Sequence, residues 1–159
     1  MKISTKGRYA LQIMVDLALH DGDGFVPLKC ISERRHIGVI KYLEQIITVL
    51  QRAGFVKSLR GNSGGYKLAR LPEEYAVGEI LRAAEGSLAP ITCLEDNANQ
   101  CPRKDKCATL AFWEGYQKAV NDYIDGITLF DLIKGKSPAG DDYCIEDSED
   151  DFCLYVKRK

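Results

Sequence analysis

The sequence predicts a mainly α-helical chain with one small β-hairpin wing, arranged as a winged helix-turn-helix that is followed by a long helix. Two helical patterns separated by a turn occupy residues 28–50, and an alternating pattern with a glycine-rich tip follows at residues 55–70. A longer amphipathic pattern extends over residues 108–134. These three observations give the order of the elements along the chain.

The helical pattern at the amino terminus follows Ser4, a favourable N-cap residue. Its apolar residues recur at helical spacing and predict one buried stripe: Ala10, Ile13, Met14, Leu17 and Ala18. His20 precedes a stretch of aspartate and glycine. We therefore expect His20 to cap the helix C-terminus rather than to bind a metal.

The helix-turn-helix pattern comprises a short helix at residues 28–34, a turn at 37–39 and a second helix from residue 40 to about Gly54. The second helix has a predicted buried stripe: Leu43, Ile46, Ile47 and Leu50. Four residues remain on its early exposed turns, where a recognition helix carries its base-reading side chains: Lys41, Tyr42, Glu44 and Gln45. A surface face without a target is the alternative. Cys30 is expected to be a small core residue.

The wing is predicted from two alternating segments, residues 55–59 and 66–70, which residues 60–65 join as a hairpin tip. Its glycines allow the backbone to approach a phosphate or the wall of the minor groove, and Arg60 offers a planar cation suited to a narrow minor groove. Candidate DNA contacts at the tip are Arg60, Gly61 and Asn62.

The charge of the chain is divided unevenly. The whole chain of 159 residues has a formal net charge of −1. Residues 1–70 carry 12 Lys or Arg against five Asp or Glu, a balance of +7, whereas residues 71–159 carry ten against 18, a balance of −8. A basic amino-terminal half favours an acidic polymer such as double-stranded DNA as partner. The alternative is that each half only solvates itself.

No run of residues approaches the roughly 18 apolar residues of a membrane span. The amino terminus also lacks the apolar core and cleavage site of a secretion signal, so we expect a cytoplasmic protein with no membrane partner. Thiols in the cytoplasm are kept reduced. The six cysteines therefore favour metal binding or redox sensing over structural disulfides.

Three of these cysteines, Cys93, Cys101 and Cys107, follow one another in the pattern Cys-x7-Cys-x5-Cys. This spacing predicts a metal site, either an iron–sulfur cluster or zinc, and a redox-active thiol pair is a third possibility. Asp105 is a candidate N-cap of the long helix, which would place Cys107 in its first turn. The helix dipole and the neighbouring basic residues would then favour the Cys107 thiolate.

The remaining segments complete the division of the chain. Residues 76–86 predict a short packing helix that ends at glycine. The long helix has a wide apolar stripe that favours burial against a second copy over internal packing: Trp113, Tyr116, Val120, Tyr123, Ile124 and Ile127. Residues 135–159 predict a flexible acidic tail. The expected segments are a DNA-binding domain (1–86), a cysteine loop (87–107), a dimerisation helix (108–134) and the tail.

Several motifs resemble a known family. Residues 1–10, the Tyr42–Gln45 segment, Arg60-Gly61 with the following Gly64-Gly65-Tyr66, and residues 77–80 are similar to the winged-helix regulators typified by IscR, NsrR and CymR. The resemblance extends over about residues 1–133. It implies a homodimeric bacterial transcription regulator with a carboxy-terminal dimerisation helix and a cluster loop that modulates DNA binding.

The chain departs from this family pattern at the fourth cluster ligand. IscR-like proteins have a histidine three residues beyond the third cysteine, where this chain has Leu110, and NsrR-like proteins have an acidic residue where this chain has Arg8. The spacing of seven between Cys93 and Cys101 is also longer than the expected five. Candidate fourth ligands are Cys144, Cys153, Asp96, Asp105, an exogenous thiol or water.

The sequence therefore predicts a dimeric DNA-binding transcription regulator, such as a repressor, that senses iron–sulfur or redox status. Cys93, Cys101 and Cys107 would hold a 2Fe–2S cluster. The alternatives are a CymR-like regulator controlled by a metabolic enzyme partner or by thiol oxidation, and a structural zinc site in place of the cluster. An enzyme is not expected, because the chain has no phosphate loop, nucleophile–base pair or paired carboxylates.

Overall fold

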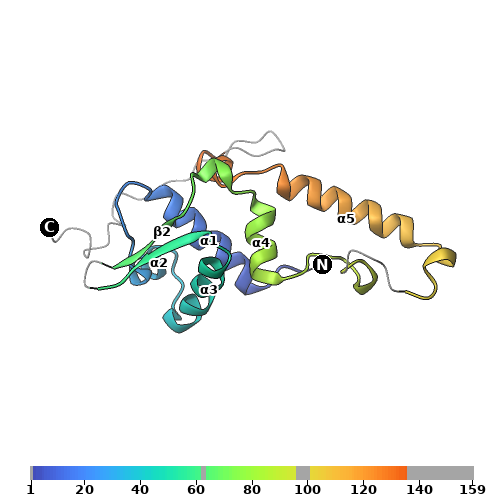
Figure 1. Cartoon of the computed structure of the whole chain (residues 1–159), viewed down its shortest axis with the longest axis horizontal. Coiled ribbons are helices and arrows are strands. Elements are labelled where there is room, and N and C mark those ends of the chain that lie inside the picture. The colour runs from blue at the N-terminus through green and yellow to red at the C-terminus, as the bar shows by residue number, and fades with distance from the viewer. Residues whose placement is uncertain (1, 62–63, 96–100, 136–159) are drawn as a thin grey trace.

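The structure is a computed structural model that describes residues 2–61, 64–95 and 101–135. Figure 1 shows the elements in order: α1 (Thr5–Leu19), α2 (Leu28–Arg34), α3 (Ile40–Arg52), β1 (Val56–Leu59), β2 (Gly65–Leu68), α4 (Val77–Glu85), α5 (Leu110–Asp125) and α6 (Leu129–Ile133). Single 3-10 turns occur at three places: Pro72–Glu74, Thr92–Leu94 and Lys104–Lys106. Candidates that lie outside the described residues are Asn62, Asp96, Cys144, Cys153 and the tail from residue 136.

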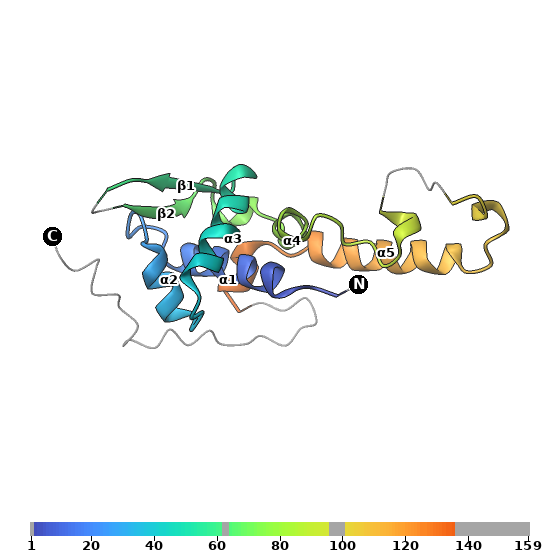
Figure 2. The same cartoon turned by 90° about the horizontal axis from the view of Figure 1, so that it is seen from below.

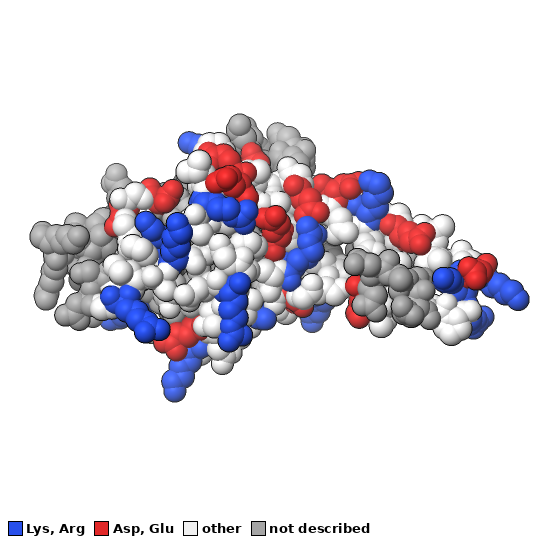
Figure 3. Space-filling view, in the orientation of Figure 1, with Lys and Arg blue, Asp and Glu red and all other residues white. Residues whose placement is uncertain are grey.

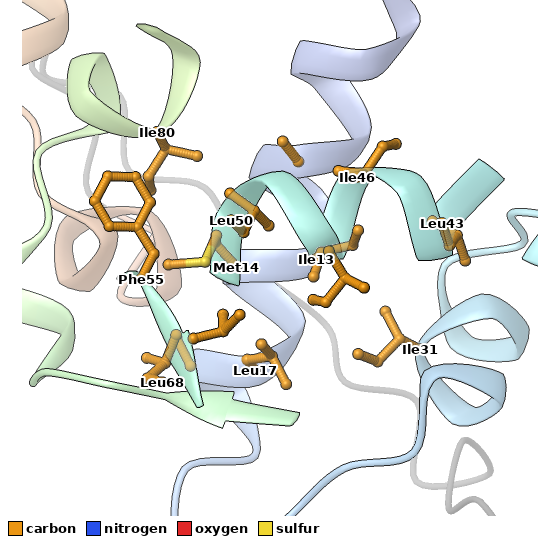
Figure 4. Packing of buried hydrophobic residues seen from close by; sticks show 14 of the residues in the cluster. Ile13, Met14, Leu17, Ile31, Leu43, Ile46, Leu50, Phe55, Leu68 and Ile80 are labelled. Atoms are coloured by element: carbon orange, nitrogen blue, oxygen red, sulfur yellow. The ribbon is translucent and has the colours of Figure 1, made fainter. Parts of the chain in front are cut away.

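Helices α1 to α4 and the hairpin of β1 and β2 pack around one hydrophobic core. We call this part of the molecule the body. Figure 4 shows side chains from α1, α2, α3, the hairpin and α4 pointing toward one another in this core. The stripes predicted for α1 and α3 are both fully covered, and Cys30 is buried as expected. The sequence periodicity of these two helices is confirmed.

The hairpin forms as predicted, with slightly shorter strands. Strands β1 and β2 pair antiparallel, with Val56 opposite Leu68 and Leu59 opposite Gly65. Val26 adds an isolated bridge to Tyr66. The amide of Val26 donates to the Tyr66 carbonyl and the amide of Tyr66 to the Val26 carbonyl, both at 2.8 Å. This bridge attaches β2 to the segment before α2.

The segment after α4 leads away from the body, and α5 carries the chain back to it (Figures 1 and 2). The expected helix of residues 108–134 is interrupted here, because α5 ends at Asp125 and a separate helix, α6, follows. Thr128 and Asp131 form a capping box that starts α6. Leu129 is fully buried in the body core, so the chain after Gly126 belongs to the body.

A set of hydrogen bonds joins the start of α1 to the end of α4. Ser4 caps α1 as predicted, and its backbone amide and hydroxyl donate to Oε1 of Glu85 at 3.1 and 2.7 Å. The amide of Gly7 donates to the same oxygen at 2.9 Å. A Cβ atom at Gly7 would lie 2.2 Å from this oxygen, which explains the glycine. Glu85 therefore ties α1 to the helix that leads into the cysteine loop.

Within the described part of the chain, no helix combines the length and the apolar character that a membrane span requires.

Candidate nucleic-acid interface and cysteine loop

Helix α3 exposes a polar row on the side away from the core. Lys41, Glu44 and Gln45 are exposed, as the sequence predicted. Tyr42 is different, because it is half-buried and its ring meets the Tyr9 ring edge-on at a centroid distance of 6.1 Å. The polar row therefore consists of three exposed side chains, with Tyr42 partly engaged in packing.

A buried carboxylate that the sequence interpretation missed fixes the helix-turn-helix. Asp16 of α1 is fully buried, and Arg34 donates to it from Nε at 3.0 Å and from Nη2 at 2.6 Å. Arg35 adds a third hydrogen bond from Nε at 3.0 Å. Both arginines lie at the end of α2, so this cluster sets the turn that leads into α3. The sequence offered one signal for this cluster, because Asp16 is an acidic residue that lies between the apolar residues Met14 and Leu17 of the predicted buried stripe.

His20 also belongs to this region. It is the C-cap residue of α1, and its ring nitrogen Nδ1 lies 2.8 Å from the Asp16 carbonyl oxygen. This contact agrees with the predicted capping role.

The hairpin presents Arg60 and Gly61 as exposed residues. Gly61 has a φ of 111°, a conformation that favours glycine. The amide of Gly64 donates to the Gly61 carbonyl at 2.9 Å, and a Cβ atom at Gly64 would lie 2.4 Å from the Leu59 carbonyl oxygen. The glycines therefore allow the tight turn that holds Arg60 at the tip.

Tyr75 fixes the base of the hairpin and was not predicted. Its hydroxyl accepts hydrogen bonds from the amides of Ala69 and Arg70 at 3.0 and 2.8 Å and donates one to the Phe55 carbonyl at 2.8 Å. On the outer side, Gln51 of α3 donates to the hydroxyl of Ser58 in β1 at 2.9 Å. The recognition helix and the wing are thus held in one arrangement.

The positive charge of the amino-terminal half is concentrated in these elements. Residues 28–70 carry nine Lys or Arg and two Asp or Glu, a balance of +7, whereas residues 1–27 carry three of each. Figure 3 shows basic side chains spread over the part of this face where α3 and the hairpin lie in Figure 1. This charge is suited to phosphate contacts.

The cysteine loop connects α4 to α5. Cys93 lies in the 3-10 turn Thr92–Leu94, and Gln117 of α5 donates to the Leu94 carbonyl at 3.3 Å. Cys101 and Cys107 flank the turn Lys104–Lys106, which lies at the far end of α5 (Figures 1 and 2). Among the described residues, no group of three or more His, Cys, Asp or Glu side chains is arranged to hold a metal ion. The structure therefore does not gather the three thiols.

The expected place of Cys107 in the first turn of the long helix is wrong. Asp105 is not the N-cap, because it lies in the 3-10 turn Lys104–Lys106. Helix α5 begins at Leu110, with Thr109 as its N-cap residue. Cys107 is exposed and precedes the helix. The helix dipole is thus not what favours its thiolate.

The direction of the expected pKa change at Cys107 nevertheless holds. The hydrogen bond with the Thr109 hydroxyl is the largest cause that lowers the pKa of Cys107, and Sγ lies 3.6 Å from that oxygen. The backbone amides of Thr109 and Leu110 and the charge of Arg103 act in the same direction, while desolvation opposes them.

The donor set fits a metal centre in its chemistry. None of the three cysteines is fully buried, and the exposed basic residues Arg103, Lys104 and Lys106 would offset the charge of a thiolate-ligated cluster. Leu110 begins α5 and Arg8 is exposed on α1, and neither side chain offers a ligand. The described residues thus supply three thiol donors and no assigned fourth ligand.

Helix α5 has an apolar stripe on its outer side. Three of its large members are exposed: Phe112 by 65%, Tyr116 by 40% and Tyr123 by 54%. Gly115 and Ala119 lie on the same face, three or four residues from these aromatic residues, and continue the stripe. Nothing in the described part of the chain covers this stripe. The predicted stripe is wrong at Ile127, which follows α5 and is buried against α4 of the same chain.

A model of the Rrf2 family, described as iron-dependent transcriptional regulators, matches residues 3–135. The IscR regulator of Aliivibrio salmonicida is 40% identical over 133 residues, which cover 84% of this chain and 77% of that protein. The names of such relatives agree with the expectation that the chain is not an enzyme.

Solved structures of related regulators have the same fold. IscR of T. potens is 43% identical, with a TM-score of 0.68 over 87% of this chain and 90% of that chain. CymR, the global cysteine regulator of B. subtilis, is 37% identical, with a TM-score of 0.68 over 83% of this chain and 95% of that chain. The mainly helical winged fold predicted from the sequence is confirmed.

Proposed function

Because the chain belongs to the Rrf2 family of transcriptional regulators, we propose that it is a cytoplasmic homodimer whose operator binding responds to an iron–sulfur cluster. The observation that carries the proposal is the connection of two features in one chain. A rigid, basic helix-turn-helix and wing lie at one end, and a loop with three thiols leads into the projecting helix at the other.

The DNA-binding part of the proposal assigns two roles. Lys41, Glu44 and Gln45 on α3 would contact base edges in the major groove, with Tyr42 beside them. Arg60, with Gly61 and Asn62, would enter the adjacent minor groove. The support is the exposure of Lys41, Glu44, Gln45, Arg60 and Gly61. The Asp16 and Tyr75 contacts also hold α3 and the hairpin before DNA is bound.

The sensing part assigns Cys93, Cys101 and Cys107 as ligands of a 2Fe–2S cluster. When bound, the cluster would supply a group whose presence depends on iron supply and oxidants. Cys93 lies in one turn, and Cys101 and Cys107 flank another, so holding one cluster would require this chain to bring the two turns together. Asp105, Asp96, Cys144, Cys153 or an exogenous ligand would complete the set.

The dimeric part rests on α5. A single copy exposes Phe112, Tyr116 and Tyr123, and burial of such side chains contributes about 1.5–3 kcal/mol each. A second α5 offers a matching apolar face in a symmetric pair. This arrangement would place two recognition helices on one operator.

A contact chain joins the cysteine loop to the DNA-binding elements. Gln117 holds the loop beside Cys93, while Arg82 of α4 pairs with Asp125 near the end of α5. Glu85, the last residue of α4, binds the first turn of α1. Movement of residues 86–107 on cluster loss would thus reach both the dimer helix and the body, which is the coupling the proposal requires.

The experiment that tests the proposal is purification without oxygen, followed by visible spectroscopy and analysis of iron and sulfide. We expect a coloured protein that binds an operator selected from random double-stranded DNA. Changing Cys93, Cys101 or Cys107 to Ala should remove the cluster and alter operator affinity. Cys30→Ala is the control, since Cys30 is a buried cysteine of α2 that lies outside the loop. A colourless protein with stoichiometric zinc would contradict the cluster.

Truncation after residue 139 tests the fourth ligand. It removes Cys144 and Cys153 while leaving the three loop cysteines in place. We expect the spectrum to be unchanged, which would exclude both tail cysteines and leave a carboxylate or an exogenous ligand. A changed spectrum would assign a tail thiolate.

A second candidate function is a thiol switch of the CymR type, with or without an enzyme partner. It is favoured by the incomplete burial of Cys93, Cys101 and Cys107, which leaves the sulfur atoms accessible to oxidants. In that case the metal-free protein should bind the operator when reduced and lose affinity after peroxide treatment. Insensitivity of the metal-free protein to peroxide would exclude this candidate.

A further inference from the structure

Two large apolar residues are exposed at the start of the recognition helix. Val39, the N-cap residue of α3, is 62% exposed, and Ile40, its first residue, is 41% exposed. Neither packs against a hydrophobic cluster in the described part of the chain. Valine is also a poor N-cap residue, and here no side chain caps the helix. Helix stability therefore does not account for these residues.

The two residues continue the buried stripe of α3 beyond the body. Val39 is four residues before Leu43, and Ile40 is seven residues before Ile47, so each lies above a buried residue on the same side of the helix. Leu43 and Ile47 are covered by the body, whereas Val39 and Ile40 extend past it. The apolar stripe thus ends in a pair of branched side chains that no described element covers.

The surroundings of this pair favour DNA as the occupant. Lys41 follows directly and is exposed, and the exposed Glu44 lies one turn after Ile40. The helix-turn-helix and wing carry a balance of +7 over residues 28–70. An apolar partner protein would have to accept this charge, whereas the phosphate backbone is complementary to it.

Resting on the proposed DNA binding, we propose that Val39 and Ile40 read thymine by packing against its C5-methyl group in the major groove. The methyl group is the only apolar feature that a base pair presents there, and it distinguishes T·A from the other pairs. The first residues of a recognition helix are those that meet base edges. Lys41, Glu44 and Gln45 would read hydrogen-bonding groups, while this pair would select for thymine beside them.

The test replaces each thymine of the selected operator by deoxyuridine, one position at a time. This change removes the methyl group and keeps every hydrogen bond. For the full-length protein we expect one or two positions per half-site to lose affinity by about fourfold, the effect of one buried methylene-sized group. Val39→Ala or Ile40→Ala should weaken binding to the thymine operator and show no further loss on the deoxyuridine operator.

Leu71→Ala is the matched control, because Leu71 is 63% exposed and lies outside α3. Its response to deoxyuridine should equal that of the unchanged protein. The proposal would be overturned if the affinity lost through Val39→Ala or Ile40→Ala simply added to the affinity lost through deoxyuridine. It would also be overturned if the unchanged protein bound every deoxyuridine operator as tightly as the thymine operator. Failure to select any operator would instead contradict the proposed DNA binding itself.

Discussion

Helices α1 and α5 are nearly equal in length but opposite in burial. Helix α1 has 15 residues and buries seven of them, whereas α5 has 16 and, in the described part of the chain, buries none. Both have apolar residues at helical spacing. The difference lies in the partner, because α1 is surrounded by α3, α4 and α6, while no described element covers the outer stripe of α5. An amphipathic pattern thus predicts a buried face without telling which chain buries it.

The same comparison applies to the ion pairs of the two regions. In the body, the buried Asp16 holds two arginines from another helix. On α5, Lys118 pairs with Asp122 one turn later, with both side chains well exposed. Burial makes the first cluster far more sensitive to loss of one partner. Substitutions in the two regions should therefore differ strongly in effect.

The largest effect is expected for Asp16→Asn. It removes the charge that Arg34 and Arg35 share in the body and leaves Arg34 buried without its partner charge. Breaking a buried ion pair on one side costs about 3–5 kcal/mol. Urea denaturation at fixed protein concentration measures this loss in the free energy of unfolding. A loss below about 1 kcal/mol would show that the cluster behaves like the surface pair of α5.

A smaller effect, on association rather than folding, is expected for Tyr116→Asp. Each copy would lose burial of an aromatic side chain worth about 1.5–3 kcal/mol, so the dimer, which loses it twice, should weaken by about 100-fold or more. Sedimentation velocity over a dilution series measures the dissociation constant. Glu114→Ala is the control, since Glu114 is exposed on the opposite side of α5. Unchanged association of the Tyr116 variant would remove α5 from the dimer interface.

The smallest effect is expected for Asp122→Asn. It breaks the pair with Lys118 within one exposed helix, where such pairs contribute about 0.3–0.5 kcal/mol. Urea denaturation should detect little change, and added salt should reduce the difference further. A loss comparable to that of Asp16→Asn would mean that this part of α5 is buried in the dimer.

The local elements were predictable from the sequence, and so were their exposed residues. The stripes of α1 and α3, the hairpin and the exposed Lys41 and Arg60 all follow from periodicity, glycine positions and charge. The start of α5 was placed too early, because Asp105 is a good N-cap residue and its 3-10 turn resembles a helix start in sequence. The capping box of Thr128 and Asp131 was a sequence signal for α6 that went unused.

Contacts between distant segments were decided only by the tertiary structure. Sequence spacing determined which faces are apolar, where the chain turns and which three thiols share a loop, because each depends on neighbouring residues. It did not determine that Asp16 would hold α2, that Tyr75 would fix the hairpin, or that Glu85 would bind α1. These contacts join residues 18 to 78 positions apart, and their energy depends on burial that only the packed chain provides.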